Sequence, residues 1–378
     1  TVKGKVDLRG LDTSNVTNFQ DVFEATKSLT GIDVTGWDVS KGTNFQGTFK
    51  TSQTPSITGL NTWNTESATD MRWMFYNMPQ ITEINIDDWK VGNVTNAQEM
   101  FKSSPKVTTI SANNLRWNSA TSLYHFFGYN DNLRTINVKN WYLPKVTDMR
   151  YFIYAVNQGA TKASGDRSQA ATLNADVWNF GTEIKDSVNF YCAQWYAKNL
   201  IINANDWDLG TRENWSASNS LFYSHDYALE YNINNLNAHG AKNMNNFVSN
   251  HANLDVLNAN SWTLPNVTSM TSAFSAITGT ITTISAKNWN FSRTAKAENV
   301  LDMTSCFQSD NTITSVDLTG WQGLNKNVNI NYMFRYTNKL EYIDMTSFDQ
   351  ANITSKTNAF WLGTLTPLTV VTNNEVLY

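Results

Sequence analysis

One pattern recurs along the whole chain with a period close to 26 residues. Its most visible member is a large apolar side chain, called the anchor below. The anchors are Leu11, Trp37, Trp63, Trp89, Leu115, Trp141, Trp178, Trp207, Leu236, Trp262, Trp289, Trp321 and Phe348. A fixed period of this length is typical of repeat proteins, whose units stack in one dimension. The 378 residues therefore need not form two or three conventional domains, and we expect a single solenoid domain over residues 1–378.

The residues before each anchor follow one apolar spacing, L-x-x-I-x-V-x-x-W. Before Trp89, for example, stand Ile81, Ile84 and Ile86. This spacing is typical of a short strand that ends at a corner. It matches the frame of a leucine-rich repeat, with an aromatic residue where that frame has Asn. We therefore expect one parallel strand per repeat, with the anchors stacked on one another where an amide ladder would otherwise run.

The residues after each anchor have a different spacing. The segment 94–101 places apolar residues at positions 97, 100 and 101, which share one face of a helix. Thr95, Thr147 and Thr268 are candidate N-caps of such helices. The predicted fold is therefore an α/β leucine-rich-repeat solenoid of about 13 repeats of ~26 residues. It would be curved, with parallel strands on one face and short helices on the other.

The ends of the chain and one long repeat depart from the period. Residues 1–14 are predicted to be an incomplete first repeat or an N-terminal cap. Residues 157–170 are predicted to be an inserted surface loop, because they are rich in Gly, Ser, Asn and Gln. Residues 362–378 are predicted to be a C-terminal cap whose last strand is 368–371. Because the sequence begins at Thr1 without Met, we expect a fragment of a longer protein, and a monomeric one.

Composition excludes some classes of partner. Charged residues make up 16% of the chain, the net charge is −4, and basic residues form no run, so a nucleic-acid partner is not expected. No apolar run approaches 18 residues, so membrane insertion is not expected. Cys192 and Cys306 are four repeats apart, about 19 Å at ~4.8 Å per stacked strand. A disulfide needs Cα atoms within about 7 Å, so we predict two free thiols.

The repeat resembles a known family. The segment Trp63 to Phe75, with the general form W-x-x-x-x-V-T-x-M-x-x-M-F, is similar to the BspA-like leucine-rich repeat of bacterial surface proteins from lactic-acid bacteria and mycoplasmas. The resemblance implies an extracellular location at the bacterial cell surface. The segment that attaches the protein to the cell would then lie outside this fragment. It also implies adhesion, with a host extracellular matrix protein, a mucin or a cell-surface glycan as partner.

One candidate binding surface is a column of polar residues four positions before the anchors. Its central members are Asn85, Ser111, Asn137, Asn174, Asn203, Asn232 and Asn258. Each lies between two apolar residues of its strand, so its side chain points to the outer, concave face. Two interpretations are compatible. The column is a hydrogen-bond ladder that stiffens the sheet, or it is a surface for glycan hydroxyl groups or for a partner loop.

A second candidate surface consists of aromatic residues outside the anchor positions. They are Trp73, Trp117, Trp195, Trp215 and Trp361, together with Tyr124, Tyr151 and Tyr223; of these Trp73, Trp117, Tyr151, Trp195 and Trp215 are the predicted ligand-binding set. Trp73, His125 and Tyr151 each follow their anchor by ten residues and would form one stripe. Exposed aromatic side chains mark interfaces and stacking platforms for sugars. The alternative is that they pack against neighbouring helices.

The sequence gives little support for enzymatic chemistry. The four histidines are not in a metal-ligand spacing, and no nucleophile elbow, P-loop or dinucleotide-binding motif occurs. We therefore predict no catalytic residue, metal or cofactor. The predicted function is an adhesion module. The alternatives are a stalk that displays another domain and, more remotely, a glycan-active enzyme, which would need two carboxylates about 5–10 Å apart in a cleft.

Overall fold

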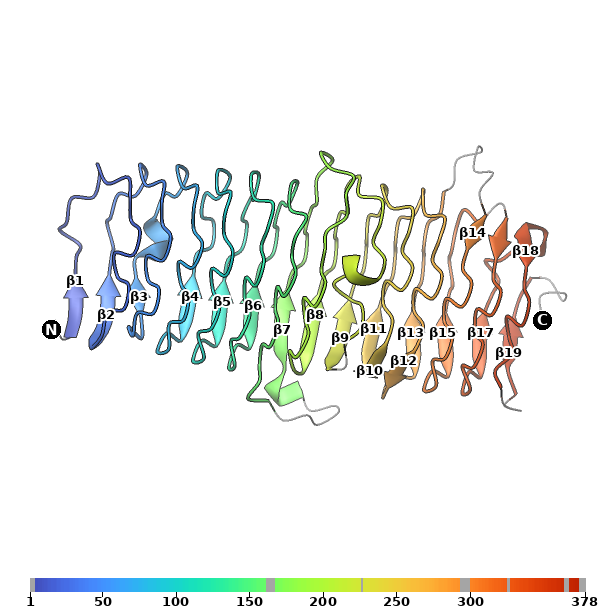
Figure 1. Ribbon diagram of the computed structural model, residues 1–378. Helices are drawn as coiled ribbons and strands as arrows, with labels where there is room; N and C mark the ends of the chain where they lie inside the picture. Colours follow the sequence, from blue (N-terminus) through green and yellow to red (C-terminus); the bar gives the residue numbers. More distant parts are fainter. Residues whose placement is uncertain are drawn as a thin grey trace. The chain divides into compact units, whose positions relative to one another are not determined.

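A computed structural model describes residues 4–160, 167–225, 227–292, 300–324, 327–363 and 367–373. The chain forms two compact units. Unit 1 contains residues up to 160 together with 167–180 and 188–200, and unit 2 contains 181–187 and the residues from 201 onward. Each unit is a parallel β-solenoid, and the described residues make about 13 turns. Figure 1 shows, within each unit, the short strands of successive turns running side by side in one direction.

Unit 1 carries one short strand per turn. The first three strands, β1 (Gly4–Asp7), β2 (Leu29–Asp33) and β3 (Ile57–Thr58), form one parallel sheet. The next four strands pair in chain order and are β4 (Glu83–Asn85), β5 (Thr109–Ser111), β6 (Thr135–Asn137) and β7 (Ala171–Asn174). Each pairs with the equivalent residues of the next repeat, so the predicted strands and their register are confirmed.

Unit 2 has the same main column of strands, and two smaller sheets beside it. The main column is β9 (Ala228–Asn232), β11 (Val256–Asn258), β13 (Thr283–Ser285), β15 (Ser315–Asp317), β17 (Tyr342–Asp344) and β19 (Thr369–Val371). The smaller sheets are β10 (His251–Leu254) with β12 (Ile277–Gly279), and β14 (Leu301–Asp302) with β16 (Val328–Asn329) and β18 (Ile353–Ser355). β8 (Leu200–Asn203) starts with the last residue of unit 1. β19 confirms the predicted last strand.

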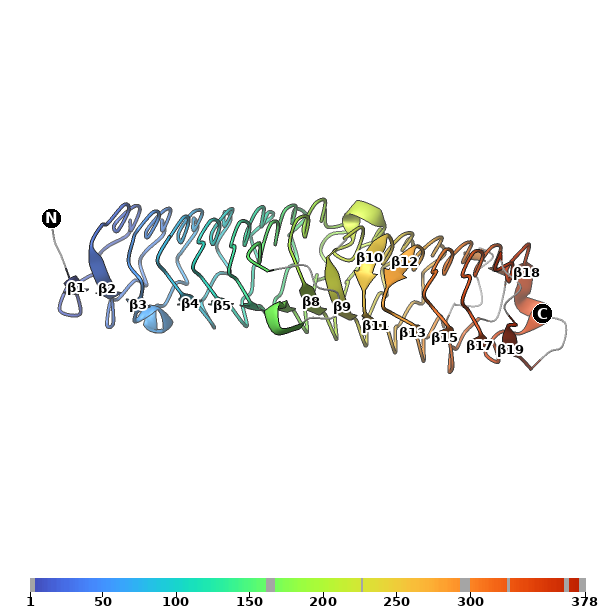
Figure 2. The ribbon, with the colours of Figure 1, turned by 90° about the horizontal axis from the view of Figure 1, so that it is seen from below.

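The prediction of a short helix after each anchor is wrong. The helices in the described parts of the chain are four single 3-10 turns, η1 (Leu60–Thr62), η2 (Arg167–Gln169), η3 (Ala217–Asn219) and η4 (Gln350–Asn352). Figure 2 shows the sides of the turns as loops and bends, with η3 as a short coil at the edge. The second half of each repeat is therefore not helical, and the α/β leucine-rich-repeat description does not hold.

The backbone conformation explains why no helix forms there. Glu99 and Ser103 are left-handed, with φ angles of 56° and 66°. A left-handed residue every fourth position ends the i to i−4 hydrogen bonding of a helix. The backbone N–H of Glu99 instead donates to the carbonyl of Tyr124, and that of Phe101 to the carbonyl of Phe126, both at 3.0 Å in the next turn. Successive turns thus pair through their backbones on this side too.

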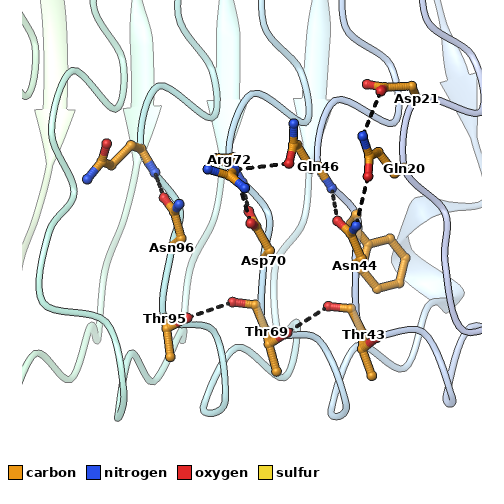
Figure 3. A network of polar contacts seen from close by, with 12 residues as sticks. Gln20, Asp21, Thr43, Asn44, Gln46, Thr69, Asp70, Arg72, Thr95 and Asn96 are labelled. Carbon is orange, nitrogen blue, oxygen red and sulfur yellow. Dashed lines mark hydrogen bonds and ion pairs between the residues drawn. The ribbon is translucent and has the colours of Figure 1, made fainter.

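The threonines predicted to be N-caps form hydrogen bonds to the preceding turn of the solenoid. The Thr95 hydroxyl donates to the carbonyl oxygen of Thr69 in the preceding turn at 3.1 Å, and Figure 3 shows this contact repeated at equivalent threonines. Thr268 donates in the same way to Lys242 at 3.2 Å. The backbone N–H of Thr147 also donates to the preceding turn, at 2.9 Å. These threonines therefore join turns, and the N-cap prediction is wrong.

In several repeats of unit 1 the residue after such a threonine makes the local turn. Oδ1 of Asp70 accepts the backbone N–H of Arg72 at 3.0 Å, and Oδ1 of Asn96 accepts that of Gln98 at 3.3 Å. These are Asx turns, which fix the start of the irregular segment. The Arg72 side chain then bonds to Gln46 of the preceding turn at 3.1 Å (Figure 3).

The anchors from Trp37 to Phe348 are buried and form the centre of each unit, whereas the first anchor, Leu11, is 54% exposed. In unit 1, Trp63 lies between Trp37 and Trp89, with ring centroids 6.1 and 5.8 Å away and nearly parallel planes. The indole N–H of Trp37 donates to the Leu8 carbonyl at 3.0 Å, and that of Trp89 to the Leu60 carbonyl at 2.9 Å. These bonds satisfy the polar atom of a buried indole. The predicted anchor stack is confirmed for these tryptophans.

Other sequence predictions concern the thiols and the chain ends. Cys192 and Cys306 are both free and buried, as predicted. The first repeat contributes β1, which pairs with β2, so residues 4–14 belong to a paired turn. The predicted loop 157–170 is described except for residues 161–166, and the predicted cap 362–378 except for 364–366 and 374–378. Among the described residues, no helix has the length and apolarity needed to cross a membrane.

Candidate binding site

The polar column lies where the strand register predicts. Asn85, Ser111, Asn137 and Asn174 are direct partners across β4 to β7 in unit 1. In unit 2, Asn232 pairs with Asn258 across β9 and β11, and Asn203 ends β8. The structure therefore aligns these residues in register within each unit.

Many side chains of the column form hydrogen bonds with one another. The side-chain amide of Asn174 donates to Oδ1 of Asn137 at 2.8 Å. In unit 2, Asn232 donates to Asn203 at 2.9 Å and Asn258 donates to Asn232 at 2.8 Å. Such amide ladders satisfy half-buried polar atoms and tie neighbouring strands together. The contacts support the interpretation of the column as a stiffening ladder.

Two of the predicted ligand-binding aromatics are core residues. Trp117 is 0% exposed and Trp215 is 1% exposed, so neither is available to a partner on the surface. Trp117 stands two residues after Leu115, where five of the other repeats carry the smaller Val or Leu, and its ring packs edge-on against Trp141 at 5.7 Å. A large residue here compensates for the small anchor. Trp215 occupies the buried position that Phe45 has in its own repeat.

The other predicted aromatics lie at the surface of unit 1. Trp73 is half-buried, with the cations of Lys50 and Arg72 at 5.6 and 5.7 Å from its ring centroid. Tyr151 is half-buried and Trp195 is 40% exposed. Tyr151 and Trp195 belong to one larger cluster, whereas Trp73 lies three repeats before Tyr151 in the chain.

This cluster, called the aromatic patch below, comes from three successive turns of unit 1. It consists of Tyr124, Tyr129, Tyr151, Tyr154, Tyr191, Trp195 and Tyr196, arranged around His125. The backbone brings the turns together, because the N–H of Tyr129 donates to the carbonyl of Tyr154 at 2.8 Å. The N–H of Tyr151 donates to Tyr191 at 3.3 Å. Neighbouring turns thus bring these rings into contact, mostly from positions one residue away from strict equivalence.

Ring contacts hold the side chains of the patch. Tyr154 lies 5.2 Å from both Tyr129 and Tyr151, and 5.4 Å from Tyr196, each in an edge-to-face arrangement. Tyr191 and Trp195 are 5.6 Å apart. Such geometry is favourable for aromatic pairs. The rings are therefore ordered before any partner arrives, which lowers the entropy cost of binding.

The outer rings of the patch face solvent. Tyr129, Tyr191, Trp195 and Tyr196 are 44%, 47%, 40% and 59% exposed. Exposure of a contiguous group of large aromatic rings to water is unfavourable, and burial of the rings against a partner would remove this free-energy cost. Groups of this kind mark interaction surfaces. The patch is therefore the candidate binding site of unit 1.

The charges at the edge of the patch are paired. Arg150 lies over the Tyr124 ring at 5.4 Å and forms two hydrogen bonds with Asp148, at 2.9 and 3.0 Å. Lys102 lies over the Tyr129 ring at 5.5 Å and is paired with Glu99 at 3.1 Å. Because each cation has its own carboxylate, the patch carries little net charge. It suits a partner recognised by stacking and hydrogen bonding rather than by charge.

The centre of the patch is uncharged at neutral pH. Burial, with a smaller effect of Lys102, lowers the pKa of His125 to about 4. Its Nδ1 is buried without a hydrogen-bond partner among the described residues. Burial also raises the pKa of Tyr151 and that of the Cys192 thiol. His125 therefore acts as one more aromatic ring, and Cys192 is an unreactive thiol beneath the patch.

Four members of the patch were not predicted from the sequence. They are Tyr129, Tyr154, Tyr191 and Tyr196. The repeat that follows Trp141 is 37 residues long, so Tyr191 and Tyr196 do not follow their neighbours at the usual interval. Removing the insertion 157–170 from that repeat would have put Tyr191 close to the column of Tyr124. The insertion therefore obscures the repeat spacing that relates Tyr191 and Tyr196 to the aromatic residues of the preceding repeats.

Fold and patch together define a β-solenoid repeat protein with an aromatic surface. A family model described as "Mycoplasma protein of unknown function, DUF285" matches residues 2–114, 52–165, 190–310 and 295–364. These matches cover most of the sequence, so the chain belongs to this family. The comparisons with curated proteins and with solved structures gave no match.

Proposed function

We propose that this chain is a binding module of a bacterial surface protein, and that the aromatic patch is its contact with a host or cell-surface protein or glycan. The observation that carries the proposal is the exposure of four patch rings, between 40% and 59%, in a chain whose other Trp and Phe side chains largely form the core. Tyr and Trp dominate binding hot spots and also stack on sugar rings. The BspA-like type of repeat and an extracellular location belong to the same proposal.

The test is binding of the purified chain to an array of matrix proteins, mucins and glycans. The variants Tyr191→Ser, Trp195→Ser and Tyr196→Ser should each weaken binding by about tenfold, the loss typical of one hot-spot side chain. The matched control is Tyr342→Ser, because Tyr342 is also a tyrosine that is 44% exposed but lies in unit 2. Undiminished binding by the three patch variants would refute the assignment of the site.

A structural spacer remains the second candidate function, because the amide ladder favours it. Asn203, Asn232 and Asn258 are joined side chain to side chain in unit 2, which stiffens neighbouring turns without leaving the amides free. A spacer needs stiffness and no ligand. If the wild-type chain binds nothing on the array or on epithelial cells, the spacer is the better interpretation.

A further inference from the structure

A second aromatic group in unit 2 surrounds a single cation. The guanidinium of Arg335 lies 5.1 Å from the ring centroid of Tyr332, 4.5 Å from Tyr336 and 5.0 Å from Trp361. The rings of Tyr336 and Trp361 are 5.0 Å apart, and the backbone N–H of Tyr336 donates to the Trp361 carbonyl at 3.1 Å. Neighbouring turns thus hold the guanidinium between aromatic faces.

Arg335 differs from comparable arginines in lacking a carboxylate partner. Arg72 and Arg150 are each paired with an aspartate two residues earlier, at 3.0 and 2.9 Å. Within the part of unit 2 that the structure describes, no carboxylate pairs with Arg335. Its Nη2 donates to the Tyr336 hydroxyl at 2.9 Å, and its Nε is buried without a partner. Since a guanidinium has five N–H donors, three on the two Nη atoms remain for a ligand.

The rings beside this cation are open to solvent. Trp361 is 47% exposed and Tyr336 is 36% exposed. A guanidinium already fixed by stacking loses little freedom on binding, and its fork of donors fits a carboxylate or sulfate. An indole face next to it can stack on the apolar face of a sugar ring. A cation and a flat ring side by side match a ligand that carries one anionic group on a ring.

We propose that Arg335, Tyr336 and Trp361 form a second binding site, which takes an acidic saccharide. The carboxylate or sulfate group would bind the free Nη donors of Arg335, and the sugar ring would stack on Trp361. An acidic peptide is a less suitable ligand, because its extended chain offers no ring for the exposed indole. This site is in unit 2, and it does not depend on the aromatic patch of unit 1 binding any partner.

The test measures affinity of the full chain by calorimetry and tryptophan fluorescence. The probes are a hyaluronan oligosaccharide with free carboxylates, the same oligosaccharide with reduced carboxyl groups, a sulfated heparin oligosaccharide, an acidic peptide and inorganic sulfate. We expect at least one acidic oligosaccharide to bind at least tenfold more tightly than the carboxyl-reduced oligosaccharide. Tighter binding of the acidic peptide than of either saccharide would overturn the proposal, and so would equal binding of sulfate alone.

Variants locate the site. Arg335→Gln and Trp361→Ala should each weaken binding of the acidic oligosaccharide at least tenfold. The conservative variants should have smaller effects: Arg335→Lys should weaken binding less than Arg335→Gln, and Trp361→Phe should retain most of the affinity. The control is Arg116→Gln in unit 1, because Arg116 also lies over a tyrosine ring, 4.5 Å from Tyr142. Unchanged affinity in Arg335→Gln would refute the site. If Arg335→Gln fails to fold by circular dichroism, Arg335→Lys and the wild-type probe series decide.

Discussion

The imidazole ring of His125 lies flat on the phenol ring of Tyr151, with centroids 4.6 Å apart and planes at 6°. Tyr124, Tyr129 and Tyr154 also contact the imidazole. A charged imidazolium in this place would be poorly hydrated, and burial together with Lys102 lowers the pKa of His125 to about 4. The patch is therefore assembled on a neutral histidine.

We predict that acid destabilises the chain through His125. The pKa of an unfolded histidine is about 6.5, so between pH 6.5 and 4 the unfolded chain binds more protons than the folded one. The stabilisation is complete above pH 6.5 and decreases as the pH falls toward 4. Between pH 7 and pH 5, the free energy of unfolding measured with urea should decrease by about 1–2 kcal/mol more in the wild type than in His125→Phe. Equal losses would contradict this, since His225, with a pKa of about 3, contributes equally to both proteins.

We predict that Val177→Asn stabilises unit 1. Val177 has a φ angle of 62° and is 46% exposed, so a β-branched residue is in a left-handed conformation that it adopts at a cost. The preceding repeats have Asp88, Asn114 and Asn140 here, linked by amide hydrogen bonds of 2.8 and 2.7 Å. An introduced amide would relieve the strain and extend this ladder. The gain in unfolding free energy should be about 1–2 kcal/mol.

Two variants separate the causes of that gain in the same urea unfolding experiment. Val177→Gly relieves the left-handed strain without adding an amide, so it should give a smaller gain than Val177→Asn. Val22→Asn changes a valine that is also 46% exposed but has no left-handed backbone, and it should give no gain. A gain at Val22 as large as at Val177 would refute the role of the backbone conformation.

We predict that the tryptophan stack is the largest single source of stability in unit 2. Trp289 lies between Trp262 and Trp321, with centroids 4.7 and 4.6 Å away, and its indole N–H donates to the Ala259 carbonyl. Trp289→Ala should cost about 3–5 kcal/mol by urea unfolding. Trp289→Phe keeps a ring in the stack and should cost less. Trp195→Ala is the control: Trp195 is 40% exposed and contacts Tyr191 at the surface, so its loss should cost clearly less than that of Trp289.

The period, the strands and the anchor stack were predictable because each depends on local residue size. Ile84 and Ile86 flank a polar residue in a spacing of two, which only an extended strand places on one side. Trp63 and Trp89 recur at the repeat length, and parallel stacking in register then places them in contact. Nothing distant in the chain is needed for these conclusions.

The second half of the repeat could not be predicted in the same way. Met100 and Phe101 have the spacing of a helix face, but two tight turns bury residues at the same interval. The choice depends on left-handed backbones at Glu99 and His125, which are not glycines, so residue type gives no sign of them. The hydrogen bonds that favour these conformations run to the next turn, and a local spacing cannot show them.

One buried carboxyl group has a polar counterpart in unit 1 that explains its environment. Asp310 is 0% exposed, its Oδ1 accepts the N–H of Ile277 at 2.7 Å, and its Oδ2 has no partner among the described residues. At the equivalent position Asn130 accepts an N–H at 2.7 Å and donates to two backbone carbonyls, of Phe101 and Phe127, at 2.8 Å. The place thus suits a neutral donor and acceptor, and burial raises the pKa of Asp310 well above its usual value.

Asp310→Asn should therefore stabilise unit 2 at neutral pH. Because its pKa is raised, Asp310 keeps its proton to a higher pH in the folded state than in the unfolded state, which releases it above about pH 3.9. The wild type thus loses stability as the pH rises from there toward the folded pKa. The variant should gain about 1–3 kcal/mol at pH 7.5 and little at pH 4, measured by urea unfolding. Asn130→Asp is the reciprocal test in unit 1, and it should destabilise the chain more at pH 7.5 than at pH 4. A gain in Asp310→Asn that is the same at both pH values would show that packing, rather than the proton, is responsible.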